Sequence, residues 1–182
     1  MWITGRKMRE VMSAKEEWTP PTDGVEEKIL HRLEDVKQRI ERLKREGKRV
    51  VFTNGGFDVL HVGHTRSLRH ARSLGDTLVV AVNSDQSLRK AKGPGRPLFP
   101  EAERVEMVAS LACTDTVFLF DDDTADATLQ ALQPHVHAKG PDYSLETVPE
   151  RATVRGYGGE IAIVGDPKDH SSTEIQRRMQ KR

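Results

Sequence analysis

Two patterns of apolar residues alternate along the chain. Short runs rich in β-branched and aromatic residues, such as 49–53, are typical of buried strands, whereas longer segments with apolar positions three or four apart are typical of helices. We expect strands at 49–53, 77–83, 116–120, 135–139 and 160–164, and helices at 64–74, 101–112, 124–132 and 172–181. This alternation predicts an α/β fold with a doubly wound, five-stranded parallel sheet.

The segment before the first strand predicts an N-terminal helical extension. Its apolar residues recur at spacings of four and three on one helical face: Ile29, Leu33, Val36, Ile40 and Leu43. That face could form a short coiled coil with a second copy or pack against its own domain, and we favour the second use. The chain then divides into a weakly structured arm at 1–24, an amphipathic helix at 25–48 and one domain at 49–182.

Composition narrows the classes of function. The 182 residues include 29 basic and 28 acidic side chains, so the net charge of +1 provides no basic field for nucleic acid. A single cysteine, Cys113, excludes an internal disulfide framework and a multi-cysteine zinc site. The N-terminus lacks an apolar signal core, and no run of about 18 apolar residues could span a membrane. We therefore expect a soluble, cytoplasmic protein with no membrane partner.

The candidate chemistry follows the strands of the predicted sheet. Four polar segments come directly after strands, at 53–64, 84–96, 140–143 and 170–173. In doubly wound sheets ligands bind beyond the carboxyl ends of the strands, so we expect these segments to converge on one crevice.

The first segment reads Thr-Asn-Gly-Gly-Phe-Asp-Val-Leu-His-Val-Gly-His from Thr53 to His64. A strand that runs through glycines into a helix directs backbone N–H groups and the positive end of the helix dipole at one point, where an anion binds. His61 and His64, three residues apart, can both donate to that anion. The alternative is that both are ordinary surface or core histidines, but few structural needs select this combination of residues. The pattern is neither a Walker A loop nor a dinucleotide GxGxxG turn.

The second segment predicts a flexible cationic loop, at 87–97, over the crevice. Its cations are Arg89, Lys90, Lys92 and Arg96, among glycines and prolines. We expect Lys92 and Arg96 to contact phosphate, followed by Lys90, because a loop can close over an anionic ligand. The alternative is a solvated surface loop. For Arg104, on the next predicted helix, a phosphate contact and a plain surface role are nearly equal alternatives.

Two groups of histidine or aspartate residues are given structural roles, and Asp58 is considered separately. His135 and His137 alternate on one strand and face the same side, but a metal site would need a third ligand, so a structural role is favoured. The run 121–123, all aspartate, precedes a helix whose dipole it complements. Asp58 differs because it lies inside the histidine turn, where it could orient the turn or the hydration shell of Mg²⁺. Apart from this role considered for Asp58, we expect no metal ligand from the protein.

The combination Gly-x-Phe-Asp-x-x-His-x-Gly-His at 55–64 resembles the signature of a nucleotidyltransferase superfamily that includes the cytidylyltransferases. That resemblance implies a Rossmann-like sheet and attack of a phosphate oxygen on the α-phosphorus of a nucleoside triphosphate, with loss of pyrophosphate. It implies catalytic roles for His61, His64 and Lys92. The implied nucleotide and phosphate contacts are Thr53, Asn54, Gly55, Gly56, Phe57, Asp58, Gly63, Lys90, Arg96, Lys139, Gly140, Ser171, Ser172 and Thr173. The implied substrate contacts are Asp85, Arg96, Asp142 and Tyr143.

Several motifs together narrow the resemblance to the D-glycero-manno-heptose 1-phosphate adenylyltransferases. They are the turn at 52–58, Lys-Gly-x-x-Arg-Pro at 92–97, Lys-Gly-x-Asp-Tyr at 139–143 and Arg-Gly-Tyr-Gly-Gly at 155–159. The resemblance implies ATP and a sugar 1-phosphate as substrates, Mg²⁺ on the triphosphate, and a transferase that stands alone without a kinase half. Since dimers are frequent among the relatives, a homodimer is one state to test.

This chain departs from the family pattern at two positions. Gly56 replaces a common cysteine, which leaves a roomier turn, and Pro141 replaces a glycine, which removes the backbone N–H donor at that position. Two other functions stay open. One is a cytidylyltransferase that acts on glycerol 3-phosphate or another polyol phosphate, and the other is a catalytically silent nucleotide-binding protein.

Overall fold

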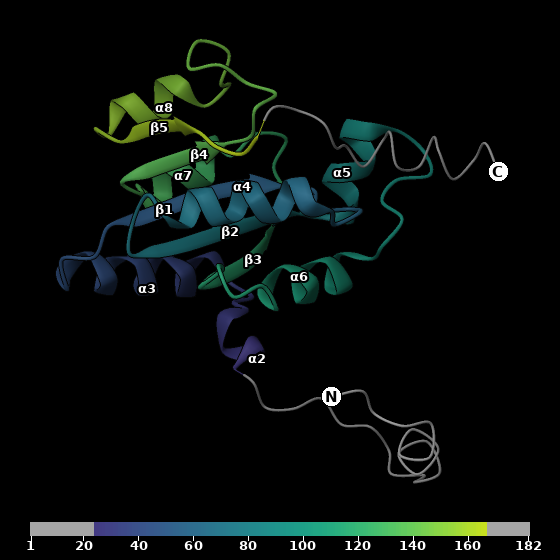
Figure 1. Ribbon diagram of the computed structural model, residues 1–182, viewed down its shortest axis with the longest axis horizontal. Coiled ribbons are helices and arrows are strands. Elements are labelled where there is room, and N and C mark those ends of the chain that lie inside the picture. Colours follow the sequence, from purple (N-terminus) through teal and green to yellow (C-terminus); the bar gives the residue numbers. More distant parts are fainter. Residues whose placement is uncertain (1–23, 167–182) are drawn as a thin grey trace, which may run out of the picture.

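Five parallel strands form one sheet at the centre of the computed structural model, which describes residues 24–166 (Figure 1). The strands are β1 (Val50–Gly55), β2 (Thr77–Asn83), β3 (Thr116–Phe120), β4 (Val136–Lys139) and β5 (Glu160–Ile163), in the order β3-β2-β1-β4-β5. All four strand pairs are parallel. The predicted α/β class and five-stranded parallel sheet are confirmed, and each strand lies within two residues of its predicted bounds.

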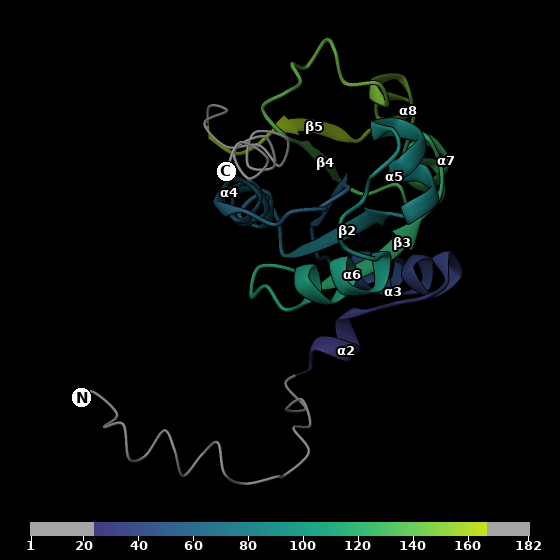
Figure 2. The same cartoon turned by 90° about the vertical axis from the view of Figure 1, so that its right-hand side faces the viewer.

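Helices cover both faces of the sheet, as apolar residues on both faces of its strands require. One core cluster joins the sheet to α4 (Val62–Arg72) and α6 (Glu101–Ala109), with α2 (Val25–Lys28) at its margin. The other joins the sheet to α3 (Leu33–Arg45), α7 (Asp126–Leu132) and α8 (Arg151–Gly156). Figure 2 shows α4 on one side of the sheet and α7 and α8 on the other. The fold is therefore a three-layer, Rossmann-like sandwich.

The direction of winding reverses next to β1. From β1 the chain proceeds outward through β2 to β3, then returns across the sheet to β4 on the opposite side of β1. The loops that follow β1 and β4 leave in opposite directions and open a crevice between them. Two of the sequence segments that carry the candidate chemistry, 53–64 and 140–143, lie at these strand ends.

The single helix predicted over 25–48 is wrong, because the chain is extended between α2 and α3. The N–H of Leu30 donates to the carbonyl oxygen of Val117 on β3 at 2.9 Å, and Ile29 forms an isolated parallel bridge with Val117. Lys28 Nζ donates to the carbonyl oxygens of Ala109 and Leu111 at the end of α6, at 3.0 and 3.2 Å. These tertiary bonds replace one turn of the expected helix. The amphipathic part that remains, α3, packs against its own domain through Val36 and Ile40.

The loop predicted at 87–97 is wrong over its first half, where α5 (Asp85–Lys92) forms instead. Ser84 caps this helix by accepting a hydrogen bond from the N–H of Ser87 at 3.0 Å, and Gly93, with φ of 89°, ends it. The short helix α8 was also not predicted. The helix predicted at 172–181 lies outside the described residues. Between residues 24 and 166, no helix has the length and apolar content to cross a membrane.

Candidate active site

A cavity of about 570 Å³ opens at the carboxyl ends of β1 and β4. It brings together residues that are up to 113 positions apart in sequence, from Thr53 to Asp166, and it is lined by the segments that follow all five strands. The predicted site residues that line it are Thr53, Asn54, Gly55, Gly56, Phe57, His61, Gly63, His64, Lys92, Lys139, Gly140, Asp142 and Tyr143. The predicted residues Asp58, Asp85, Lys90 and Arg96 are not part of its lining.

The turn after β1 is tightly packed. A Cβ atom on Gly56 would lie 2.7 Å from Cδ1 of Leu88 on α5, and one on Gly55 would lie 3.2 Å from the ring of Phe57. Phe57 itself has a φ of 47°, which non-glycine residues rarely adopt. The expectation of a roomier turn at Gly56 is therefore wrong, because Leu88 fills the space that a side chain would occupy.

His61 and His64 form a reciprocal cap at the start of α4. Nδ1 of His61 accepts a hydrogen bond from the N–H of Gly63 at 3.1 Å, and Nδ1 of His64 accepts one from the N–H of His61 at 3.4 Å. Both Nδ1 atoms therefore act as acceptors, so a neutral ring at either position carries its proton on Nε2. The two ring centroids lie 3.9 Å apart. The helix start thus fixes the tautomer and orientation of both side chains.

His64 is neutral near pH 7. Burial lowers its pKa to about 4, with further contributions from the nearby His61 and Lys92. Its ring also packs against Phe57, with centroids 5.4 Å apart. A neutral His64 cannot repel a cation beside it, and its Nε2–H can donate to an anionic oxygen in the cavity.

Asp58 anchors the loop after α5 rather than facing the cavity. One carboxylate oxygen accepts hydrogen bonds from the N–H groups of Leu98 and Phe99, at 2.5 and 3.3 Å, and the other pairs with Arg96. Burial opposes ionisation of Asp58, but these partners together lower its pKa below the usual value. Because both oxygens are engaged, Asp58 is suited to hold the turn and not a metal hydration shell. Arg96, predicted as a phosphate contact, is the partner of this buried carboxylate.

Arg104 is fully buried, so the surface role considered for it is wrong. Its guanidinium donates to the carbonyl oxygens of Gly56 and Phe99, at 2.5 and 3.0 Å, and forms an ion pair with Asp85 at 2.7 Å. Arg104 thus ties the glycine turn to α5 and α6. This contact also explains why Asp85 does not reach the cavity, because its carboxylate is held by Arg104.

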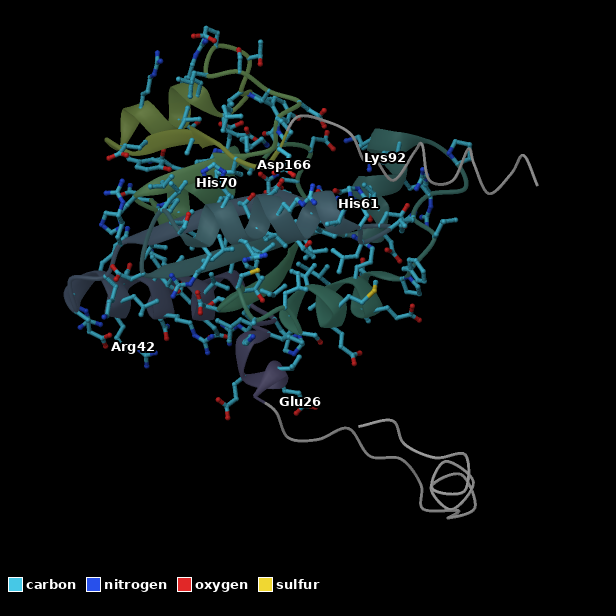
Figure 3. The ribbon with its side chains drawn as sticks, viewed as in Figure 1. Glu26, Arg42, His61, His70, Lys92 and Asp166 are labelled. Atoms are coloured by element: carbon cyan, nitrogen blue, oxygen red, sulfur yellow. The ribbon has the colours of Figure 1, made fainter. Side chains whose placement is uncertain are left out.

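Lys92 is the cation of α5 that lines the cavity. Figure 3 shows it at the same end of the molecule as His61. Burial lowers the pKa of Lys92, and the nearby Arg96 and Arg104 add to that effect. Lys90, two residues earlier, lies outside the cavity lining and pairs at 2.5 Å with Asp123, with 68% of its side chain exposed. The half-turn between them on α5 directs the two lysines differently, so Lys92 lines the cavity while Lys90 contacts the cavity only through its partner Asp123.

Lys139 at the end of β4 lies on the opposite wall of the cavity. Its Nζ donates to Oδ1 of Asn54 at 3.2 Å and to Oε1 of Glu150 at 3.4 Å, and it lies 4.8 Å from the centroid of the Tyr143 ring. His137, a residue for which a structural role was favoured, is fully buried beneath this group, and its Nε2 lies 3.3 Å from the same oxygen of Asn54.

Several lining residues were missed by sequence reasoning. Glu150 follows no periodic pattern, and the aspartate run at 121–123 was assigned to the helix dipole alone, although Asp123 and Thr124 line the cavity. Asp166 after β5 is also part of the lining. A hydroxyl or carboxylate that follows a strand was the available signal. The predicted phosphate contacts Ser171, Ser172 and Thr173, together with His170, lie outside the described residues.

No described residues form a metal site. Between residues 24 and 166, no group of three or more His, Cys, Asp or Glu side chains could hold a metal ion. The cavity is lined by two lysines, two histidines and four carboxylates, which are Asp123, Asp142, Glu150 and Asp166. Two of these carboxylates are paired with residues of the flanking helices, Asp123 with Lys90 on α5 and Asp166 with Arg66 on α4.

Comparisons with known proteins agree with this geometry. Residues 52–178 match the family model described as cytidylyltransferase-like. The chain is 45% identical over 146 residues to the bifunctional protein HldE of Syntrophotalea carbinolica and 48% identical over 143 residues to that of Pelobacter propionicus. These matches cover 80% and 79% of this chain but only 30% and 29% of those proteins.

Solved structures show the same fold. The lipopolysaccharide core biosynthesis protein from Thermoplasma volcanium is 26% identical, with a TM-score of 0.59 over 67% of this chain and all of that one. Pantothenate synthetase from Thermus thermophilus, 18% identical with a TM-score of 0.54 over 79% of this chain and 63% of that one, shares the fold alone. With a family model that matches most of the chain, the protein belongs to the cytidylyltransferase-like family and is a nucleotidyltransferase.

Proposed function

We propose that this enzyme transfers AMP from ATP to a sugar 1-phosphate, D-glycero-manno-heptose 1-phosphate, and releases pyrophosphate. The observation that carries this proposal is the reciprocal cap of His61 and His64 beside Lys92, at the start of a helix that faces the cavity. The relatives named HldE and the relative named for lipopolysaccharide core biosynthesis support a sugar phosphate as the acceptor.

The chemistry requires no general base. An oxygen of the sugar phosphate, already anionic near neutral pH, attacks the α-phosphorus of ATP, and the bond from that phosphorus to the bridging oxygen of pyrophosphate breaks. The barrier comes from bringing anions together and from the charge that develops on the phosphoryl oxygens. A neutral His64 with a proton on Nε2 suits a donor to those oxygens, and Lys92 adds positive charge on the α5 side.

We propose that Mg²⁺ enters with the triphosphate. The described lining has four carboxylates against two lysines, so its own cations do not balance a triphosphate and a second phosphate. Bound Mg²⁺ would mask part of the triphosphate charge. Asp58 is not its ligand in this proposal, because Arg96 and two backbone N–H groups hold both carboxylate oxygens.

A matrix of substrates tests the assignment. Four nucleoside triphosphates are combined with D-glycero-manno-heptose 1-phosphate, mannose 1-phosphate and glycerol 3-phosphate, each with and without Mg²⁺, and pyrophosphate release is measured. We expect turnover with ATP, the heptose phosphate and Mg²⁺. Preference for CTP with glycerol 3-phosphate would overturn the proposal in favour of a polyol-phosphate cytidylyltransferase. ATP binding without turnover of any acceptor would indicate that catalysis has been lost.

A further inference from the structure

Glu150 is a buried carboxylate for which the proposed chemistry has no role. It precedes α8, lines the cavity and is only 2% exposed. Its Oε1 accepts hydrogen bonds from Nζ of Lys139 at 3.4 Å and from the N–H of Ala125 at 3.3 Å. A buried carboxylate is costly unless it is paired, so its presence here calls for a reason.

The contacts of Glu150 connect three strand ends. Lys139 is the last residue of β4, and its ammonium also donates to Asn54 near the end of β1. Ala125 lies between β3 and α7, directly before α7. Ala125 comes directly after Thr124 of the cavity lining. One carboxylate thus holds both a cation of the crevice and the loop that carries Thr124 of the cavity lining.

Lys139 depends on these partners for its direction. Its ammonium carries three protons, and the surroundings provide Glu150, Asn54 and the face of the Tyr143 ring at 4.8 Å from the centroid. Only 6% of Lys139 is exposed. Removal of one partner would leave a long side chain free to choose another rotamer or to lose its proton.

We propose that Glu150 is a positioning residue for nucleotidyl transfer, which keeps Lys139 charged and directed at the bound substrates. This inference rests on the proposed function, since Lys139 is assumed to act on an anionic ligand of the same cavity.

The charged groups around Lys139 determine how the proposal can be tested. Burial lowers the pKa of Lys139, whereas Glu150, and to a smaller extent Asp126 on α7, raise it. His137 on β4 is neutral, because burial and the nearby Lys139 lower its pKa to about 3. Asn54 and the Tyr143 ring bear no charge near neutral pH. Glu150 is therefore the nearest anion that opposes the loss of the Lys139 proton.

The test is the pH profile of kcat/KM for ATP and D-glycero-manno-heptose 1-phosphate in wild-type protein and in Glu150→Gln. We expect the alkaline limb of the variant to lie about 1–3 pH units lower, because an opposite charge at this range shifts a pKa by that amount. Glu146→Gln, which changes an exposed carboxylate of the same loop, is the matched control and should leave the profile in place.

Two further variants separate positioning from simple structural support. Glu150→Asp keeps the negative charge, so its alkaline limb should stay near that of the wild type even where kcat falls. In Lys139→Met, the addition of Glu150→Gln should reduce kcat/KM less than threefold, because the group it positions is already gone. Lower activity of Glu150→Gln with an unshifted profile, or full additivity with Lys139→Met, would overturn the inference. If the wild-type protein itself fails to turn over these substrates, the proposed function fails first and the inference fails with it.

Discussion

The N–H of His61 donates to the ring of His64, while the ring of His61 accepts from the N–H of Gly63. Each Nδ1 atom is thereby committed to the backbone, which leaves the Nε2 proton as the donor of a neutral ring. The two residues therefore combine a helix cap with a pair of oriented donors. Loss of either ring should weaken the helix cap and remove a donor, and measurements of stability and of activity can separate the two effects.

Replacement of His64 tests its role as a donor. In His64→Ala we expect kcat to fall by about 10²–10³-fold, the cost of a lost donor to developing charge. Loss of the cap should lower the free energy of unfolding by only about 1 kcal/mol, so the protein stays folded. His31→Ala, which changes an exposed histidine outside the cavity lining, is the control. Near-normal pyrophosphate release by His64→Ala would refute the donor role.

The lowered pKa of His64 predicts a specific dependence of stability on pH. Between pH 6.5 and about 4, the unfolded chain binds a proton at this position that the folded chain does not, so the free energy of unfolding falls as pH falls. The shift corresponds to at most about 3 kcal/mol. Denaturant unfolding at pH 7 and pH 4.5 should show a smaller loss in His64→Asn, whose amide oxygen can still accept the His61 N–H. Equal losses in both proteins would contradict the neutral state.

The buried pair of Asp58 and Arg96 should dominate the stability of the loop after α5. Asp58→Ala leaves the guanidinium and two N–H groups without their acceptor, and we expect the free energy of unfolding to fall by about 3–5 kcal/mol. Asp122→Ala, which removes an exposed carboxylate, should change it by less than about 0.5 kcal/mol. Chemical denaturation measures both. A small loss in Asp58→Ala would show that the loop is held by other contacts.

Gly56 is predicted to be required for packing. In Gly56→Ala the new methyl group meets Leu88 at 2.7 Å, and overpacking should lower the free energy of unfolding by about 1–3 kcal/mol. Leu88→Ala creates space at the same place, so the double variant should be more stable than the sum of the single losses predicts. Gly156→Ala, with no atom within 4 Å of the added group, is the neutral control. Strict additivity would exclude the contact.

A comparison of two lysines on α5 tests the boundary of the site. Lys92 lines the cavity and should lose about a hundredfold in kcat/KM as Lys92→Met, because a positive charge near the transferred phosphate is removed. Lys90 pairs with Asp123 at the surface, so Lys90→Met should change kcat/KM by less than about threefold. Similar losses for both would indicate that the bound triphosphate also contacts Lys90, outside the cavity lining.

The sequence predicted the parts of the fold that depend on local pattern. All five strands were found because their runs are apolar and β-branched, and the crevice followed from parallel topology. The break between α2 and α3 could not be predicted, because it depends on hydrogen bonds to β3 and to the end of α6, more than eighty residues away. The helix α5 was not predicted, because the segment with its cationic residues was interpreted as a loop.

The candidate site was predicted less completely than the fold. Residues inside motifs, such as His61, Lys92 and Lys139, were found and are placed together. Charged residues with tertiary partners were misplaced, since nothing local shows that Arg96 pairs with Asp58 or that Arg104 is buried beneath Gly56. Glu150 was missed for the same reason, since its place in the site depends on contacts with Lys139 and Ala125.

The extended segment between α2 and α3 has a consequence for association between molecules. A sheet edge with free N–H and carbonyl groups is a template for strand addition by another chain. Ile29 and Leu30 occupy part of the outer edge of β3 through their bonds to Val117, while β5 forms the opposite edge. The extended segment between α2 and α3 thus protects part of the β3 edge from pairing with another chain. Removal of that segment would expose the edge and favour aggregation by edge-to-edge pairing.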